Sequence, residues 1–459
     1  MSAIITDPFK KQFMQKILDE VSNLTARYYI GIGKNDEWNS TETVPTPTDT
    51  PKSIRDAQNA LQSVKAVAAS SFVIPRHNWS SGSEYSGYDD QYATIPSNTY
   101  YVLTEDNHVY ICLQQSKSGT GAVNASTVKP TGTSAKPFKT IDGYTWRFLY
   151  SLSASDTSSF LSANFVPVKL VTTASDAFET IQKAAQDSAD AGRIANIIVT
   201  NQGSGYDPSS PPTVTITGNS GAIGDSAQAT AFISSGKVVK IDMLNESAGS
   251  GRNFVNATVT ISGGGGSGAT ARAVLGPANG IGADPRDELK ATSLMFNAKP
   301  NGTENGDFLA GNDQDFRQVM LIRNPRTDSD DGTILTATTN KALRYLKADS
   351  AFASQLSIDE LITNGSTPPA KAYVNEVVNY GNVSNMKVYY HQTDSTGYTP
   401  FSVGDTLTDE GAQTGTIAVV ADSNEQYINT SGEVLYIENR APVVRTSTQV
   451  EDIKVVVTL

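Results

Sequence analysis

The side chains that most often carry catalysis or bind metals are few in this sequence. There are three histidines, His77, His108 and His391, and one cysteine, Cys112. No two histidines have the short spacing that would place both on one face of a helix as zinc ligands. A single cysteine can form neither an intramolecular disulfide nor a thiolate metal cluster. We therefore predict no catalytic residue, no cofactor-binding residue and no metal ligand.

Three short motifs were weighed as phosphate or cation sites. Gly31-Ile32-Gly33-Lys34 follows an apolar strand, but it lacks the Gly-Lys-Ser/Thr ending of a phosphate-binding loop and the helix that should follow it. Residues 263–268 are glycine-rich and lie between two strand patterns, which favours a hairpin loop. Residues 328–332 resemble the start of a calcium loop, but the glycine comes one position early and position twelve is not glutamate. We interpret that segment as a solvated acidic turn, with an adventitious cation site as the minor alternative.

Carboxylates and aromatic side chains leave two further functions open. Paired carboxylates about 5–10 Å apart across a cleft hydrolyse glycosides, and a sequence alone does not show such a pair. No Gly-x-Ser-x-Gly elbow supports an esterase. A group of aromatic residues is typical either of a sugar-stacking surface or of a core or interface, and we favour the second. That group consists of Trp79, Tyr85, Tyr88, Tyr92, Tyr100 and Tyr101.

Composition and charge exclude several classes of protein. The 459 residues carry a formal net charge of −12, which argues against nucleic-acid binding and against docking on an anionic membrane. The longest apolar runs, such as Ile453–Leu459, are far shorter than the roughly 20 residues that span a bilayer. The first eight residues lack the pattern of a secretory signal. We expect a soluble protein in a reducing compartment.

Three helices are predicted to position these side chains. The first begins at Asp7 and Pro8, with an apolar stripe that needs either the protein's own core or a neighbouring subunit. A second begins near Ser53 and extends as far as Ala68, and a third covers residues 174–191. The stripe of the first helix consists of Phe9, Phe13, Ile17, Val21 and Leu24.

Most other patterned segments predict β-strands. Residues 144–150 place Tyr144, Trp146, Phe148 and Tyr150 on one face of a strand. Residues 341–347 fit either a helix or a strand. The other predicted strands cover residues 28–32, 100–103, 109–113, 316–322, 374–380, 386–390, 415–420, 432–438 and 454–459.

The middle of the chain is a twofold repeat. Strand and turn patterns over residues 197–232 return over residues 241–271, with an offset of 45 or 46 residues that falls to about 40 in the last block. Each copy alternates apolar with small polar residues, as half-buried antiparallel strands do. We predict a mainly β (α+β), multi-domain protein with antiparallel sandwich-like or barrel-like domains and a few helices. The predicted parts are an α+β body at 1–193, an inserted glycine-rich all-β repeat module at 194–282 and a β-rich domain at 283–459.

Three stretches resemble a known family. One is Tyr28–Lys34 with Trp38. A second is the pair Val109–Leu113 and Asp142–Tyr150, closing on Phe165–Val168. The third and most specific is Gly432–Arg445, running on to Glu451–Lys454. Together they resemble the baseplate wedge subunit encoded by gene 8 of T-even-like contractile-tailed bacteriophages, over most of residues 1–190 and 370–459.

The resemblance implies a non-enzymatic virion component without a cofactor. Members of that family are β-rich homodimers that contact other wedge proteins in a baseplate whose rearrangement triggers sheath contraction. The chain would then be assembled in the host cytoplasm and located in the tail baseplate of the virion. Residues 194–282 depart from the family pattern. Two alternatives stay open: a module that binds host-surface glycans and a polysaccharide-degrading enzyme.

Overall fold

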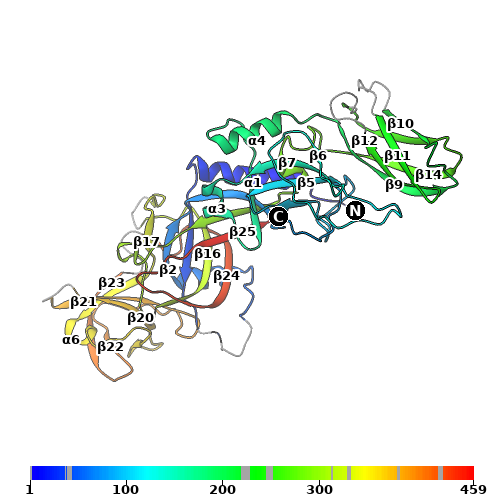
Figure 1. Ribbon diagram of the computed structural model, residues 1–459. Coiled ribbons are helices and arrows are strands. Elements are labelled where there is room, and N and C mark those ends of the chain that lie inside the picture. Colours follow the sequence, from blue (N-terminus) through cyan, green and yellow to red (C-terminus); the bar gives the residue numbers. More distant parts are fainter. Residues whose placement is uncertain are drawn as a thin grey trace. The chain divides into compact units, whose positions relative to one another are not determined.

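The computed structural model describes residues 3–36, 38, 44–218, 228–243, 252–311, 314–327, 332–379, 383–421 and 427–459 (Figure 1). Strands hold 40% of these residues and helices 13%, so the predicted mainly β fold is confirmed. The residues group into two compact units. Unit 1 contains residues 1–14, 71–293 and 458–459, and unit 2 contains residues 15–70 and 294–457. The three-part division stays a prediction, because contacts alone do not define independently folding domains.

Unit 2 contains a five-stranded sheet in the order β17-β2-β1-β16-β24. Every residue of its middle strand β1 is buried, because sheet neighbours lie on both sides and side chains pack on both faces. The strands are β1 Tyr28–Gly33, β2 Leu61–Ala66, β16 Asp315–Arg323, β17 Thr339–Lys341 and β24 Glu433–Val444.

The second predicted helix is too long. Helix α2 Pro51–Asn59 is capped by Thr50 rather than Ser53, and the chain continues as strand β2. Leu61 and Val64 fit a helical spacing, but both are fully buried in a strand that pairs with β1 and β17. Long-range pairing thus overrode the local period.

A second sheet of unit 2 is a closed barrel in the order β18-β21-β20-β19-β22-β23. Alternate residues point inward, so Ala372 and Val374 of β20 are buried in the barrel core while Tyr373 points outward. The barrel elements are β18 Arg344–Asp349, α6 Ser350–Ala353, β19 Leu361–Asn364, β20 Lys371–Val378, β21 Asn385–His391, β22 Thr406–Thr408 and β23 Thr414–Ala421.

Unit 1 contains a four-stranded aromatic sheet in the order β4-β5-β7-β6, and helix α4 packs on β7. Trp146 and Phe148 on one face of β7 and Arg147 and Leu149 on the other are all buried. The elements are β4 Tyr101–Leu103, β5 His108–Gln114, β6 Phe138–Lys139, β7 Thr145–Ser151 and α4 Ala177–Asp187.

The repeat forms a six-stranded sheet of unit 1 in the order β12-β11-β10-β13-β14-β9. Exchanging β9, β10 and β11 for their repeat counterparts β12, β13 and β14 reverses this order, as a twofold operation does. In the central pair, Thr215 lies opposite Thr260, its own counterpart in the repeat, so a pseudo-twofold axis passes between them. The strands are β9 Ile194–Ser204, β10 Thr213–Gly218, β11 Gln228–Ser234, β12 Lys237–Met243, β13 Ala257–Ser262 and β14 Ser267–Leu275.

The remaining elements complete the two units. Strand β3 pairs with β8, and β15 pairs with β25. The bounds are α1 Asp7–Ser22, β3 Ala69–Pro75, α3 Ala154–Phe160, β8 Phe165–Val168, α5 Pro285–Glu288, β15 Ser293–Ala298, η1 Glu304–Gly306 and β25 Ile453–Thr458. None of the helices within the described ranges is long and apolar enough to cross a membrane.

Candidate functional site

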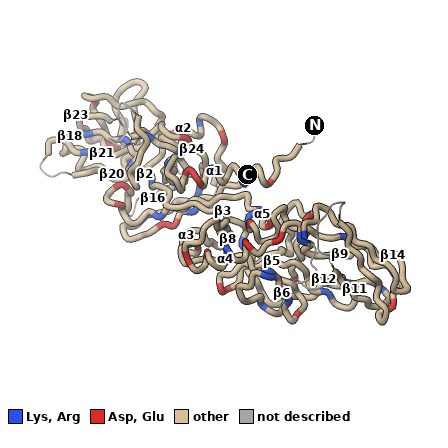
Figure 2. Tube along the Cα trace, turned by 90° about the horizontal axis from the view of Figure 1, so that it is seen from above, with Lys and Arg blue, Asp and Glu red and all other residues tan. Residues whose placement is uncertain are grey.

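The residues singled out for possible chemistry do not gather at one place. His77, His108 and Cys112 belong to unit 1 and His391 belongs to unit 2. Cys112 is fully buried, and this burial raises the pKa of its thiol. Within the part of the chain that the structure describes, no three His, Cys, Asp or Glu side chains are grouped to hold a metal ion. Figure 2 shows basic and acidic residues interspersed along the described chain.

The aromatic group belongs mainly to the core of unit 1. Tyr85, Tyr88, Tyr100 and Tyr101 are all buried, and their rings make edge-to-face contacts with aromatic neighbours. Trp79 and the other member, Tyr92, are half-buried. The packing agrees with the interpretation of this group as core, and it leaves little of the rings to stack on a ligand.

The glycine motifs have structural positions. Gly263–Gly266 connect β13 with β14, as the hairpin interpretation predicts. Gly33 ends strand β1, and the next residue, Lys34, is 3% exposed and forms ion pairs with carboxylates. Asp328–Asp331 lie outside the described residues.

Lys34 lines a cavity of about 510 Å³ in unit 2, whose walls carry polar side chains throughout. One wall comes from the ends of β1 and β16 in the five-stranded sheet. The opposite wall comes from the outward face of β20 and β21 in the barrel and from the loops beside them. The lining residues are Lys34, Asn35, Asp36, Arg317, Asp359, Tyr373, His391 and Ser395.

A chain of ion pairs crosses this cavity. Lys34 Nζ lies 2.7 Å from Asp315 Oδ1, and Arg317 Nε lies 2.8 Å from Asp315 Oδ2. Asp315 therefore bridges the two cations with its two oxygens. Lys34 Nζ also donates to both oxygens of Asp359, at 2.6 Å, and this carboxylate comes from the barrel. The pairing explains how a buried lysine is accommodated.

The imidazole of His391 is buried in the wall of the cavity. Desolvation, with a smaller contribution from the nearby charge of Lys34, lowers the pKa of His391 to about 3. The ring is therefore neutral near pH 7. Its Nδ1 lies 2.7 Å from Asn375 Oδ1, which fixes the ring against β20.

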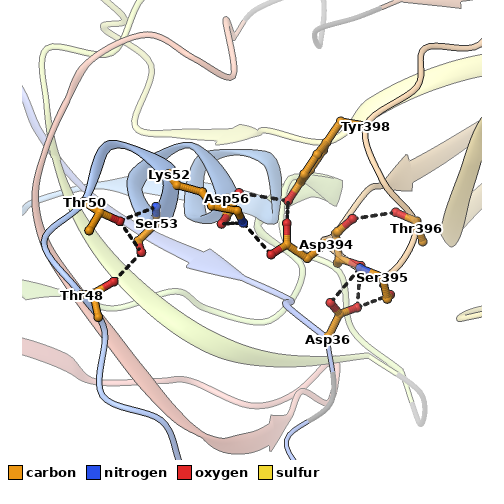
Figure 3. Close-up of polar contacts among 11 residues, drawn as sticks. Asp36, Thr48, Thr50, Lys52, Ser53, Asp56, Asp394, Ser395, Thr396 and Tyr398 are labelled. Atoms are coloured by element: carbon orange, nitrogen blue, oxygen red, sulfur yellow. Dashed lines mark hydrogen bonds and ion pairs between the residues drawn. The ribbon is translucent and has the colours of Figure 1, made fainter.

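A hydrogen-bonded network continues from the cavity along the junction between α2 and the barrel (Figure 3). The hydroxyls of Thr393 and Ser395 both donate to Asp36 Oδ1, at 2.5 Å. Nearer to α2, Lys52 Nζ lies 2.7 Å from Asp56 and 2.5 Å from Asp394. The Tyr398 hydroxyl lies 3.2 Å from Asp56, and we call this whole set of contacts the polar seam. Exposed ion pairs such as those of Lys52 add little stability.

Serine, histidine and aspartate share the cavity, but not in the order of contacts that nucleophilic catalysis needs. In that order the base lies between the nucleophile and the carboxylate. Here the Ser395 hydroxyl donates directly to Asp36, and His391 contacts Asn375 instead. An imidazole with a pKa near 3 is also a weak base at neutral pH. The arrangement can bind polar groups, and its contacts are not those of an acyl-transfer site.

Glu288 in unit 1 is a buried carboxyl with a strongly shifted pKa. Glu288 at the end of α5 is 1% exposed, and its burial raises the pKa of the carboxyl to about 8. Its Oε1 accepts a hydrogen bond of 2.7 Å from the backbone of Gly282. The residue lies in the core and does not line the cavity described above.

No protein-family model matches this chain, and no curated protein matches it either.

Only some of the residues at the cavity stand out in the sequence. Lys34 was noted at the end of a glycine-rich strand, and His391 was noted as one of three histidines. Asp315 and Arg317 were missed, although charges two residues apart in a strand lie on one face and here share one ion-pair network. Asp359, Tyr373 and Ser395 carry no sequence signal, because each occupies an ordinary loop or strand position.

Proposed function

We propose that this protein is a structural, non-enzymatic subunit of the baseplate wedge of a contractile-tailed bacteriophage. In this role it forms a homodimer that contacts other wedge proteins and takes part in the rearrangement that triggers sheath contraction. The proposal starts from the three stretches that resemble this family. Two of them include β1 and β24 of the five-stranded sheet, and the other includes β5 and β7 of the aromatic sheet. The resembling residues therefore contribute strands to sheets in both units.

The observation that most supports an assembly role is the apolar surface near the N-terminus. Ile4 and Ile5 are 86% and 62% exposed, and Phe9 and Phe13 of α1 are 61% and 49% exposed. The predicted stripe is covered only in part, because Val21 is buried while its two phenylalanines are not. Neighbouring apolar side chains left in water are typical of a surface that a partner covers.

The pair of substitutions Phe9→Asp and Phe13→Asp tests this surface. Burial of one such side chain contributes about 1.5–3 kcal/mol, so losing both is expected to weaken dimer association by about 100-fold or more. We expect a dimer at micromolar concentration for the unsubstituted protein and a monomer for the double variant, measured by analytical ultracentrifugation. Phe178→Asp on α4 is the matched control, since Phe178 is also exposed, at 44%, and should leave the dimer intact.

Mass spectrometry of purified virions tests the location of the protein, and a cryo-EM map of an isolated baseplate tests its neighbours. A protein that stays strictly monomeric at micromolar concentration and is absent from virions would exclude the proposed role. A dimer that persists in the double variant would leave the role standing but place the dimer interface elsewhere.

A further inference from the structure

We infer that the cavity of unit 2 binds a neutral, polyhydroxylated ligand, with the chemistry of a sugar residue. Its volume of about 510 Å³ lies in the range of roughly 300–1,000 Å³ that small-molecule sites occupy. Three buried polar side chains line it, those of Lys34, Arg317 and His391, and placed polar groups of this kind fix the orientation of a ligand in a binding pocket. This inference does not depend on the proposed role in a baseplate.

The charges of the cavity favour a neutral ligand. Lys34 and Arg317 are cations, and three carboxylates lie among or behind the lining residues, those of Asp36, Asp315 and Asp359. The excess of one negative charge disfavours an anion, while the buried lysine and arginine disfavour a cation. A sugar hydroxyl both donates and accepts hydrogen bonds, so it can satisfy carboxylates and cationic donors at once.

Acceptors and donors are available on both walls. Asp359 is the most open of the charged groups, with 42% of its side chain exposed, so its carboxylate can accept from a ligand as well as from Lys34. His391 has Nδ1 engaged with Asn375, and the second nitrogen of the neutral ring is then an acceptor. Ser395 lines the same cavity and adds a hydroxyl.

Tyr373 supplies an aromatic surface. It points outward from β20 because its neighbours Ala372 and Val374 point into the barrel core. Its ring is half-buried, and its centroid lies 5.7 Å from that of His391. An aromatic ring beside several planar polar groups suits a sugar, since a pyranose presents an apolar C–H face as well as hydroxyls.

A ligand in this place would touch both the end of β1 and the barrel. Ligand that binds only the folded state stabilises it by mass action. Saturating sugar is therefore expected to raise the melting temperature of the unsubstituted protein more than that of Tyr373→Ala. The difference between the two shifts separates binding at the cavity from the general stabilisation that sugars and phosphate give any folded protein.

Ligand-observed NMR with the full chain tests the inference. The probes are glucose, N-acetylglucosamine and their β-linked tetramers, with sodium phosphate and magnesium chloride as charged comparisons. We expect binding of at least one sugar, weakened about tenfold or more by Tyr373→Ala, which corresponds to roughly 1.4 kcal/mol of lost contact. Tyr373→Phe keeps the ring and should keep most of the binding.

Tyr398→Ala is the matched control, because Tyr398 lies on the polar seam, with its hydroxyl 3.2 Å from Asp56, and does not line the cavity. Asp359→Asn is a second variant at a half-exposed loop position, and it should weaken binding even if Tyr373→Ala folds poorly. The inference is overturned if none of the sugars binds, if only phosphate or magnesium binds, or if Tyr398→Ala and Tyr373→Ala weaken binding equally.

Discussion

Replacing Glu451 by glutamine is expected to destabilise unit 2 by about 3–5 kcal/mol, because it leaves the cation of Arg445 buried without its partner. Arg445 is 2% exposed and Glu451 is 8% exposed. Two parallel contacts of 2.8 Å join the guanidinium to the carboxylate. The other guanidinium donors reach the backbone oxygens of Leu309 and Gly302, at 2.9 Å. The arginine thus ties three segments together, and it belongs to the most specific of the stretches that resemble the wedge family.

The measurement is the free energy of unfolding from urea titration, followed by hydrogen exchange of peptides from unit 2. The control is Glu438→Gln, since the pair formed by Glu438 and Arg440 is 36% and 40% exposed and has a separation of 3.4 Å. An exposed pair of this kind contributes only about 0–1 kcal/mol. If Glu451→Gln costs no more than the control, Arg445 does not hold the fold as described. The double replacement of Arg445 and Glu451 by methionine should recover part of the loss, because no charge then stays buried.

Glu288→Gln is expected to stabilise unit 1 increasingly as the pH rises from 5 to 8. The carboxyl has an ordinary pKa of 4.5 and a folded-state pKa of about 8, raised mainly by desolvation. Between these values the unfolded chain releases a proton that the folded chain keeps. The stability of the unsubstituted protein therefore falls with rising pH by about 1.4 kcal/mol per pH unit. Glutamine does not titrate, so this dependence disappears in the variant.

The difference between the variant and the unsubstituted protein should grow by on the order of 3–4 kcal/mol from pH 5 to pH 8. Hydrogen exchange of peptides from β5 and β7 reports it within unit 1. The change with pH is the decisive quantity, since a constant cost of packing the amide adds equally at every pH. Glu105→Gln is the control, because 80% of the Glu105 side chain is exposed. A difference that stays constant across this range would show that Glu288 is ionised in the folded protein.

The strand prediction succeeded where the pattern itself was decisive. Tyr28–Gly33 is apolar and short, and the structure has it as the buried strand β1. The segment from Leu61 to Ala66 was misassigned to a helix because its apolar residues fit a spacing of three and four. Its partners β1 and β17 come from distant parts of the chain, and pairing with them makes the segment a strand. Helix α3 was missed, although Ser153 and Asp156 form a capping box there.

The candidate cavity was the least predictable feature. Its residues come from positions 34–36, 317, 359, 373, 391 and 395, and sequence spacing gives no information about their distance in space. The sequence also did not indicate that Tyr373, rather than the aromatic group of residues 79–101, would present a half-buried ring beside polar groups. Packing determines which aromatic rings stay accessible, since four of the aromatic group are buried in unit 1.

By itself the sequence determined the fold class, the internal repeat and the scarcity of catalytic side chains. These follow from composition and from local periodicity, which depend only on residues near one another in the chain. The offset of the repeat even agrees with the pairing of Thr215 and Thr260, because equivalent strands paired by a twofold operation must match in register. Only the tertiary structure decided which charges are buried in pairs, which aromatic rings stay accessible and where a cavity forms. Those features depend on contacts between distant segments, whose free energies are set by burial and geometry rather than by local pattern.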